Sequence, residues 1–353
     1  MVSFPKSAGR YAGRALTALL GGAIFASAGC EKTTAARGDS ELSAPSSGGD
    51  SNAAHTQPAT PSVVAETGTS KVDREHDAGD ALRVVRFPWR PPDASAEAYA
   101  MDEAEDQHRI VLPTTRTEGA ALPVLVAFHG QPKRGQAPRS YAFATAVMAT
   151  MRRAVAAGDV RPIALVLPVF RYVGQNWPRF DVVAFQTEIE RHLAAEGVKS
   201  NGYYVVGHSG AAGCGGDGMN RVHRMKPSAV GFFDTCLGAG WRDEVQRLRE
   251  AHVPTLLVHS LETAAFSPRQ ATEYLSTFDF GRAYGPAGLS PSACPDRLPS
   301  APLRNQPFRC SADGQGTTQG LIVDSGEGEE GHNALVPIAL EYFLKTYVGP
   351  GAR

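Results

Sequence analysis

The sequence has no excess of charge of one sign, no long hydrophobic run and few cysteines. Its 353 residues carry 35 Lys and Arg against 36 Asp and Glu, a formal net charge of -1, so it lacks the strongly basic surface that nucleic-acid binding needs. No run of about 18 apolar residues occurs, which excludes a polytopic membrane protein. With 42% hydrophobic residues, 37 glycines and 25 prolines, the composition is that of a loop-rich globular protein.

The first thirty residues have the features of an export signal. Three positive charges within the first fourteen residues precede a short apolar stretch at 15–28, which is the pattern of a secretory signal. The stretch ends in Ser-Ala-Gly followed by Cys30, which resembles a bacterial lipobox. We therefore expect residues 1–29 to be a lipoprotein-type signal peptide, with an ordinary signal peptide as the alternative. Lipidation of Cys30 would anchor an exported protein to the cell envelope, at the outer membrane or periplasmic face.

Residues 30–80 are predicted to be a disordered tether. From 31 to 80, 29 of the 50 residues are Ala, Ser, Thr, Gly or Pro, and none is aromatic. Such a segment buries too little apolar surface to offset its loss of chain entropy on folding. The folded domain is then expected to span residues 81–348.

Within this domain, short apolar runs alternate with segments of helical period. This alternation predicts an α/β fold, a mostly parallel eight-stranded sheet with helices on both faces. The last helix is expected at 333–347, with Pro337 in its first turn, where a missing N–H is tolerated. The eight strands are predicted at 82–87, 109–112, 123–128, 163–169, 203–206, 229–233, 255–258 and 321–323, and the other main helices at 140–157 and 181–195.

One segment, 280–319, interrupts the alternation because it is rich in Pro, Gly and Ser. A loop of this length is commonly functional, so we expect a lid or insertion near an active site; a surface excursion held by a disulfide is the alternative. The four cysteines besides Cys30 are an even number in an exported chain, which predicts two disulfides. Sequence proximity favours Cys294 with Cys310 and leaves Cys214 with Cys236.

The most informative motif is GHSGA at 207–211, directly after the strand predicted at 203–206. A buried strand that runs into Gly-x-Ser-x-small is typical of a nucleophile elbow, in which Ser209 would be the nucleophile. The small residues Gly207 and Ala211 fit so tight a turn. A regular helix is expected to follow the elbow.

A second motif, HGQ at 129–131, follows the strand predicted at 123–128. In an elbow of this kind, one oxyanion donor is the amide after the nucleophile and another comes from the loop after the third strand. The predicted donors are therefore the backbone amides of Gly210 and Gln131. We interpret His129 as structural.

Among the ten histidines, His332 follows the last strand and opens the last helix, which fits the chain order serine, acid, histidine. His208 is expected to face away from the site. The acid is Asp234, at the end of the sixth strand, or Glu262, after the seventh. Asp234 is preferred because a buried strand-end carboxylate needs a partner. Asp324 is a third, weaker candidate.

With these motifs, residues 123–347 resemble the α/β-hydrolase family. The resemblance implies a serine hydrolase that cleaves an ester-type bond through an acyl-enzyme, with a small-molecule or envelope ester as substrate and no metal or organic cofactor. A peptidase on the same fold, or an inactive binding lipoprotein that kept the fold, remains an alternative.

Overall fold

A computed structural model describes residues 82–99, 103–114, 119, 121–138, 141–171, 176–212, 217–236, 239–260, 289–292, 307–313, 315–323, 325–326 and 328–350. All of them belong to one compact unit, Thr67–Arg353. The expected signal peptide at 1–29, Cys30 and the tether lie outside the described residues. Within the ranges above, no helix is long and apolar enough to span a membrane.

Ten strands form one mixed sheet in the order β1-β2-β4-β3-β5-β6-β7-β10-β9-β8. The six central strands, β4, β3, β5, β6, β7 and β10 in spatial order, pair in parallel. At one end of the sheet β1 pairs with β2 and β2 with β4, and at the other end β8 pairs with β9 and β9 with β10; all four of these pairs are antiparallel. The strands are β1 (Leu82–Phe87), β2 (His108–Pro113), β3 (Ala121–Phe128), β4 (Ala164–Leu167), β5 (Lys199–His208), β6 (Ala229–Phe233), β7 (Thr255–Ser260), β8 (Leu289–Pro291), β9 (Pro307–Asp313) and β10 (Thr318–Val323).

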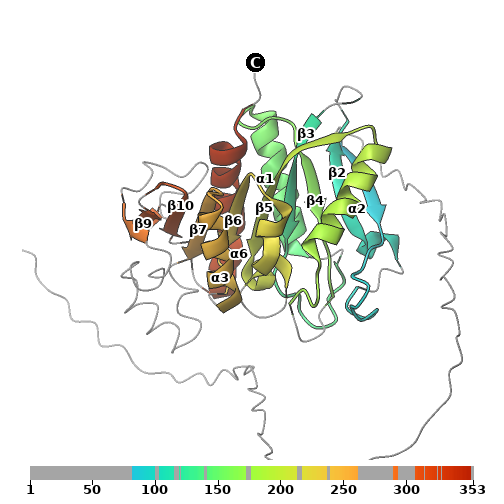
Figure 1. Cartoon of the computed structure of the whole chain (residues 1–353), viewed down its shortest axis with the longest axis horizontal. Helices are drawn as coiled ribbons and strands as arrows, with labels where there is room; N and C mark the ends of the chain where they lie inside the picture. Colours follow the sequence, from blue (N-terminus) through green and yellow to red (C-terminus); the bar gives the residue numbers. More distant parts are fainter. Residues whose placement is uncertain are drawn as a thin grey trace, which may run out of the picture. The chain divides into compact units, whose positions relative to one another are not determined.

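Helices pack on both faces of the sheet, as the sequence pattern predicts. α2 (Val182–Ala195) and α3 (Ala239–Glu250) cover one face, and α1 (Ala142–Ala156) and α6 (Gly328–Phe343) cover the other (Figure 1). Asp181 begins α2 by accepting the backbone N–H groups of residues 183 and 184, which satisfies two donors that the first turn leaves open.

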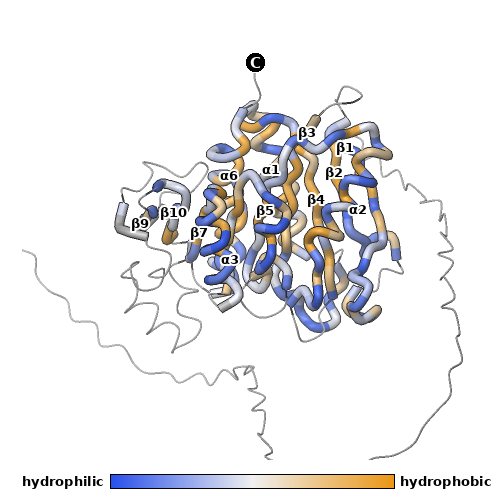
Figure 2. Tube along the Cα trace, in the orientation of Figure 1, coloured by the Kyte–Doolittle hydropathy of each residue, from blue (hydrophilic) through white to orange (hydrophobic). Residues whose placement is uncertain are grey.

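The alternation of side chains along each strand separates the core into two layers. Phe185, Ile189 and Leu193, the predicted stripe of α2, are fully buried in one layer. Leu335 and Ala339 of α6 are buried in the other. The central strands β3 and β4 are largely hydrophobic along their length (Figure 2), because both of their faces are covered by helices. Full burial of one Phe, Ile or Leu side chain stabilises the fold by about 1.5–3 kcal/mol.

Within the described residues the sheet has ten strands, whereas the sequence pattern predicts eight. The two additional strands, β8 and β9, come from the segment 280–319, for which the sequence predicts a lid or insertion. They lie at one end of the sheet, with β8 as the edge strand and β9 between β8 and β10; an edge strand can be short, and proline is tolerated there or at the first residue of a strand. Their Pro-rich composition hides them in the sequence pattern.

The last helix begins earlier than predicted. It starts at Gly328 instead of 333, with Glu329 and Glu330 in its first turn, where negative charge is favourable. Pro337 therefore lies inside the helix and not in its first turn. Its missing N–H leaves the backbone carbonyl of Asn333 without its normal helical donor.

Candidate active site

The parallel register aligns the carboxyl ends of the central strands. Phe128, the last residue of β3, pairs with Gly207 of β5, and His208 pairs with Phe233, the last residue of β6. Residues that follow these strands therefore emerge at one edge of the sheet, the edge formed by the carboxyl ends of the parallel strands. In open α/β sheets this is the edge at which ligands bind.

Ser209 directly follows β5 and has a backbone φ of 55°, a left-handed conformation that is strained for a non-glycine residue. The turn is tight, because a Cβ on Gly207 would lie 2.0 Å from Met219 Sδ and 2.8 Å from Ala211 Cβ. Short 3-10 helices, η3 (Ser209–Ala211) and η4 (Gly218–Met225), lie where a regular helix was expected.

Asp234 and His332 meet at the same edge. Asp234 follows β6, and its Oδ2 accepts the Nδ1–H of His332 at 2.7 Å, although the two residues are 98 positions apart. The other carboxylate oxygen accepts the N–H of Ser260 at 3.0 Å. The Asp234 side chain is 3% exposed and that of His332 18%, so the imidazole is accessible while the carboxylate is not. Glu262 and Asp324, the other candidate acids, lie outside the described residues.

His332 lies in the early part of α6 and is fixed from two sides. A Cβ on the preceding Gly331 would lie 2.1 Å from the carbonyl oxygen of Gly326, so the loop before α6 approaches the helix closely. His208 donates its Nε2–H to the carbonyl of His332 at 3.1 Å, and the two rings are 4.1 Å apart. His208 therefore faces His332, contrary to expectation. Burial and the neighbouring His332 lower the pKa of His208 to about 3.

The loop after β3 contacts the serine directly. A Cβ on Gly130 would lie 2.6 Å from Ser209 Cβ and 3.1 Å from its Oγ, so only glycine fits there. Gln131, whose amide is a predicted oxyanion donor, comes next in this loop. In the described part of the chain, no hydrogen bond joins Ser209 Oγ to His332; such bonds in unliganded sites often form fully only with substrate.

His129 holds this loop in a defined orientation. Its Nε2 accepts the N–H of Phe170 at 3.2 Å, so Nδ1 carries the proton and donates to the carbonyl of Gly130 at 2.6 Å. That carbonyl belongs to the same peptide unit as the Gln131 N–H, and in a trans peptide the two groups point in opposite directions. Burial lowers the pKa of His129 to about 3, which keeps it neutral. His129 therefore fixes the direction of the Gln131 amide.

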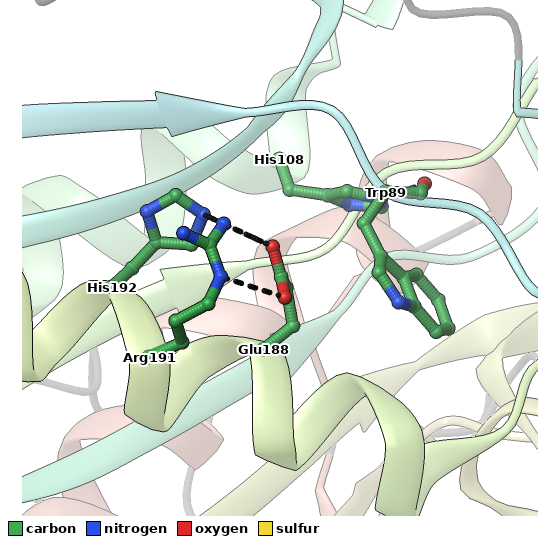
Figure 3. Close-up of polar contacts among 5 residues, drawn as sticks. All are labelled: Trp89, His108, Glu188, Arg191 and His192. Carbon is green, nitrogen blue, oxygen red and sulfur yellow. Dashed lines mark hydrogen bonds and ion pairs between the residues drawn. The ribbon is translucent and has the colours of Figure 1, made fainter. Parts of the chain in front are cut away.

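A second group of titratable residues lies away from this edge, between α2 and the first strands (Figure 3). His108 donates its Nε2–H to the carbonyl of Trp89 at 2.8 Å and accepts the Val169 N–H at Nδ1, at 2.9 Å. Burial lowers its pKa to about 4. Both ring nitrogens are occupied, so His108 is a neutral structural residue.

The rest of this group lies on one turn of α2. Arg191 donates to Glu188 through Nε at 3.1 Å, and this bond lowers the pKa of Glu188. His192 lies 3.2 Å from the same carboxylate, and burial lowers its pKa. These contacts tie the side chains of one turn of α2 together (Figure 3).

A second histidine–carboxylate pair links η4 to α3. His223 Nδ1 lies 2.6 Å from Glu244 Oε2, and Glu244 also accepts the backbone N–H of His223 at 2.6 Å. Burial raises the pKa of Glu244. Glu244 lies on a helix, whereas Asp234 follows the end of a strand.

Two of the predicted disulfide cysteines, Cys236 and Cys310, are described, and both are disulfide-bonded. Their predicted partners, Cys214 and Cys294, lie outside the described residues, so the pairing stays a prediction. Among the residues that the structure describes, no group of three or more His, Cys, Asp or Glu side chains is arranged to hold a metal ion.

No protein-family model and no curated protein sequence matches the chain. Several solved structures resemble it at low identity. A ferulic acid esterase is 14% identical with a TM-score of 0.47, over 76% of this chain and 98% of its own. A feruloyl esterase module from Clostridium thermocellum is 12% identical with a TM-score of 0.45, over 77% and 91%. A ferulic acid esterase from Anaeromyces mucronatus is 11% identical with a TM-score of 0.42, over 78% and 94%.

The strand order and the elbow define the class of fold. A mostly parallel sheet covered on both faces carries a strained serine directly after its central strand β5. The loop that approaches this serine follows β3, and the serine, the carboxylate and the histidine come in that order along the chain. The chain therefore has the α/β-hydrolase fold, as the sequence predicted.

Proposed function

We propose that this chain is a serine hydrolase that cleaves carboxylic ester bonds through an acyl-enzyme. One observation carries the proposal. The elbow serine, with its φ of 55°, emerges at the same sheet edge as a buried carboxylate that holds an accessible imidazole at 2.7 Å. A nucleophile, a base and a group that orients the base are the parts that acyl transfer by serine requires.

In this proposal, His332 acts through Nε2. Its Nδ1–H donates to Asp234, so the lone pair on Nε2 accepts the Ser209 proton as Oγ attacks the acyl carbon. The carboxylate of Asp234 keeps the imidazole in this tautomer and stabilises the imidazolium. His332 then returns the proton to the leaving alcohol oxygen, and water attacks the acyl-enzyme by the same route to release the acid.

The negative oxygen of the tetrahedral intermediate needs fixed donors. The proposed donors are the backbone N–H groups of Gly210 and Gln131. The second is supported by the hydrogen bond from His129 to the Gly130 carbonyl, which sets the orientation of that peptide before substrate arrives. Removing one such donor typically costs about 10²–10³ in kcat.

The proposed substrate is a small-molecule or cell-envelope ester. A panel of nitrophenyl esters of increasing acyl length, run beside peptide anilides, tests the bond type. Faster turnover of esters is expected. Turnover of anilides alone would make the chain a peptidase on the same fold.

The triad is tested by non-additivity. Ser209→Ala and His332→Ala should each lower kcat by about 10⁴–10⁶, and the double variant should be no worse than the single variants, because the residues act as a unit. A double variant that loses the product of the two single effects would contradict the proposal. Circular dichroism of each variant checks that the fold is retained.

A further inference from the structure

Asn176 is a buried polar residue beside the proposed oxyanion site, and no sequence pattern singles it out. It is 4% exposed, and among the residues that the structure describes its Oδ1 has no hydrogen-bond partner. Leaving a buried polar atom unpaired lowers stability, so its presence in a folded protein calls for an explanation, of which a catalytic role is one.

The carboxamide of Asn176 lies against Gly210. From the position that a Cβ on Gly210 would occupy, Asn176 Nδ2 is 2.7 Å away and Oδ1 is 3.1 Å away. Asn176 thus fills the space of the side chain that Gly210 lacks, next to the backbone amide proposed to stabilise the oxyanion.

Neighbouring contacts hold Asn176 in place. The next residue, Trp177, is fully buried with a φ of 51°. Its Nε1–H donates to the carbonyl of His129 at 3.0 Å, and its own carbonyl accepts the N–H of Asp217 at 3.0 Å. Asn176 is therefore fixed between the donor loop after β3 and the chain that follows the elbow.

We propose that Asn176 is a side-chain donor to the substrate's acyl oxygen, adding to the amides of Gly210 and Gln131. Both ends of the carboxamide lie against Gly210, and rotation about the Cβ–Cγ bond exchanges them. The negative charge that develops on the acyl oxygen selects the orientation in which Nδ2–H faces it. A bound ester then supplies an acceptor for Nδ2–H. This inference rests on the proposed serine hydrolase activity.

The first test compares Asn176→Ala with wild type on a nitrophenyl acetate. We expect kcat to fall about 10²–10³-fold with KM changed less than about threefold, because the donor acts on the transition state. The melting temperature should stay equal or rise, since the variant removes a buried unpaired polar group. Asn201→Ala, an exposed position on β5, is the matched control and should behave as wild type.

Asn176→Asp is an independent test of the donor role, and it still applies if the alanine variant does not fold. The ionised carboxylate repels the oxyanion, whereas the protonated acid can donate a hydrogen bond. The ratio of variant to wild-type kcat should therefore rise as pH falls through the pKa of the new carboxyl group. A purely structural role gives a ratio that does not change with pH.

The outcomes separate this inference from the proposed function. If wild type reacts with a fluorophosphonate, Ser209→Ala does not, and Asn176→Ala keeps kcat within about threefold of wild type, the hydrolase proposal stands and the role of Asn176 is wrong. A loss of kcat that is matched by a lower melting temperature, with a pH-independent ratio for Asn176→Asp, also overturns it. If Ser209→Ala still reacts normally, the proposed function itself is wrong.

Discussion

At the residue scale, two of the candidate site residues have backbone angles that only glycine adopts without strain. Ser209 has φ of 55° and Asp234 has φ of 51°, and each such conformation costs about 1–3 kcal/mol. Surrounding contacts maintain both: Gly130 packs on Ser209, and Ser260 donates its N–H to Asp234. Strained backbone angles of this kind are common in active sites, where the surrounding structure holds the reacting groups in position before substrate binds.

The acid is tested by amide substitution. Asp234→Asn can still accept the Ser260 N–H, but its NH₂ group replaces the acceptor for His332 Nδ1–H and favours the wrong tautomer. We expect turnover of a nitrophenyl ester to fall by about 10⁴, and Glu262→Gln to have a mild effect.

Glu244→Gln is the matched control for that experiment, because it changes another buried carboxylate that holds a histidine, His223. It should affect stability more than turnover. A mild Asp234→Asn together with a severe Glu262→Gln would move the acid to the residue after β7. Two mild results would point to Asp324 or to a serine–histidine dyad.

The sequence could point to Ser209, Asp234 and His332 because each follows a buried strand in the chain order of the fold. It could not show that Asp234 and His332 meet at 2.7 Å, or that His208 packs on His332, since both contacts join residues about a hundred positions apart. Asn176 carries no local signal at all, because its position depends on how the chain beside Trp177 packs under the elbow.

At the scale of elements, the elbow depends on the close packing of β5 against η4. Gly207→Ala would place a methyl group 2.0 Å from Met219 Sδ and 2.8 Å from Ala211 Cβ. We expect a loss of about 1–3 kcal/mol from overpacking, together with a loss of activity as Ser209 is displaced. Chemical denaturation and ester turnover measure the two effects.

Gly240→Ala, on α3, is the control for this substitution. Its added Cβ would lie no closer than 3.3 Å to Asn220, and alanine favours a helix over glycine. It should be neutral or stabilising. If Gly207→Ala were equally well tolerated in stability and turnover, the tight packing of the elbow would be wrong.

The interior elements were more predictable than the edges. The β6 run at 229–233 and the buried stripe of α2 follow from apolar periodicity alone. The edge strands β8 and β9 do not, because their pairing depends on β10 more than on their own composition. The early start of α6 was missed because Gly328 and the acidic residues after it read as a loop.

At the scale of the whole molecule, buried neutral histidines make the fold sensitive to acid. Burial lowers the pKa of His108 from 6.5 to about 4 and that of His129 and His208 to about 3. The unfolded chain therefore binds more protons than the folded chain between these values and 6.5. Their contribution to stability is complete above about pH 6.5 and is lost as pH falls towards the folded-state values.

We accordingly expect the free energy of unfolding to decrease as the pH is lowered from 6.5 to 4.5. Each of the three histidines contributes a slope of up to about 1.4 kcal/mol per pH unit. Urea denaturation at half-unit intervals measures this slope. A free energy that stays constant or rises on acidification in this range would contradict the neutral, buried state of these side chains.

The lipidation of Cys30 is a separate prediction about the whole chain, drawn from the lipobox. Cys30→Ala should move the protein from the membrane fraction to the soluble fraction, because stable anchoring depends on the acyl chains. Fractionation of cells that express the two forms measures this. Continued membrane association of the variant would contradict the prediction.

The most direct test of the central claim is labelling by a fluorophosphonate, which reacts with an activated serine and with few other groups. The wild-type protein should take up one label per chain, located by mass spectrometry on the peptide that contains Ser209. The Ser209→Ala variant, with an unchanged circular dichroism spectrum, should take up none. A label on another residue, or undiminished labelling of the variant, would contradict the assignment of Ser209 as the nucleophile.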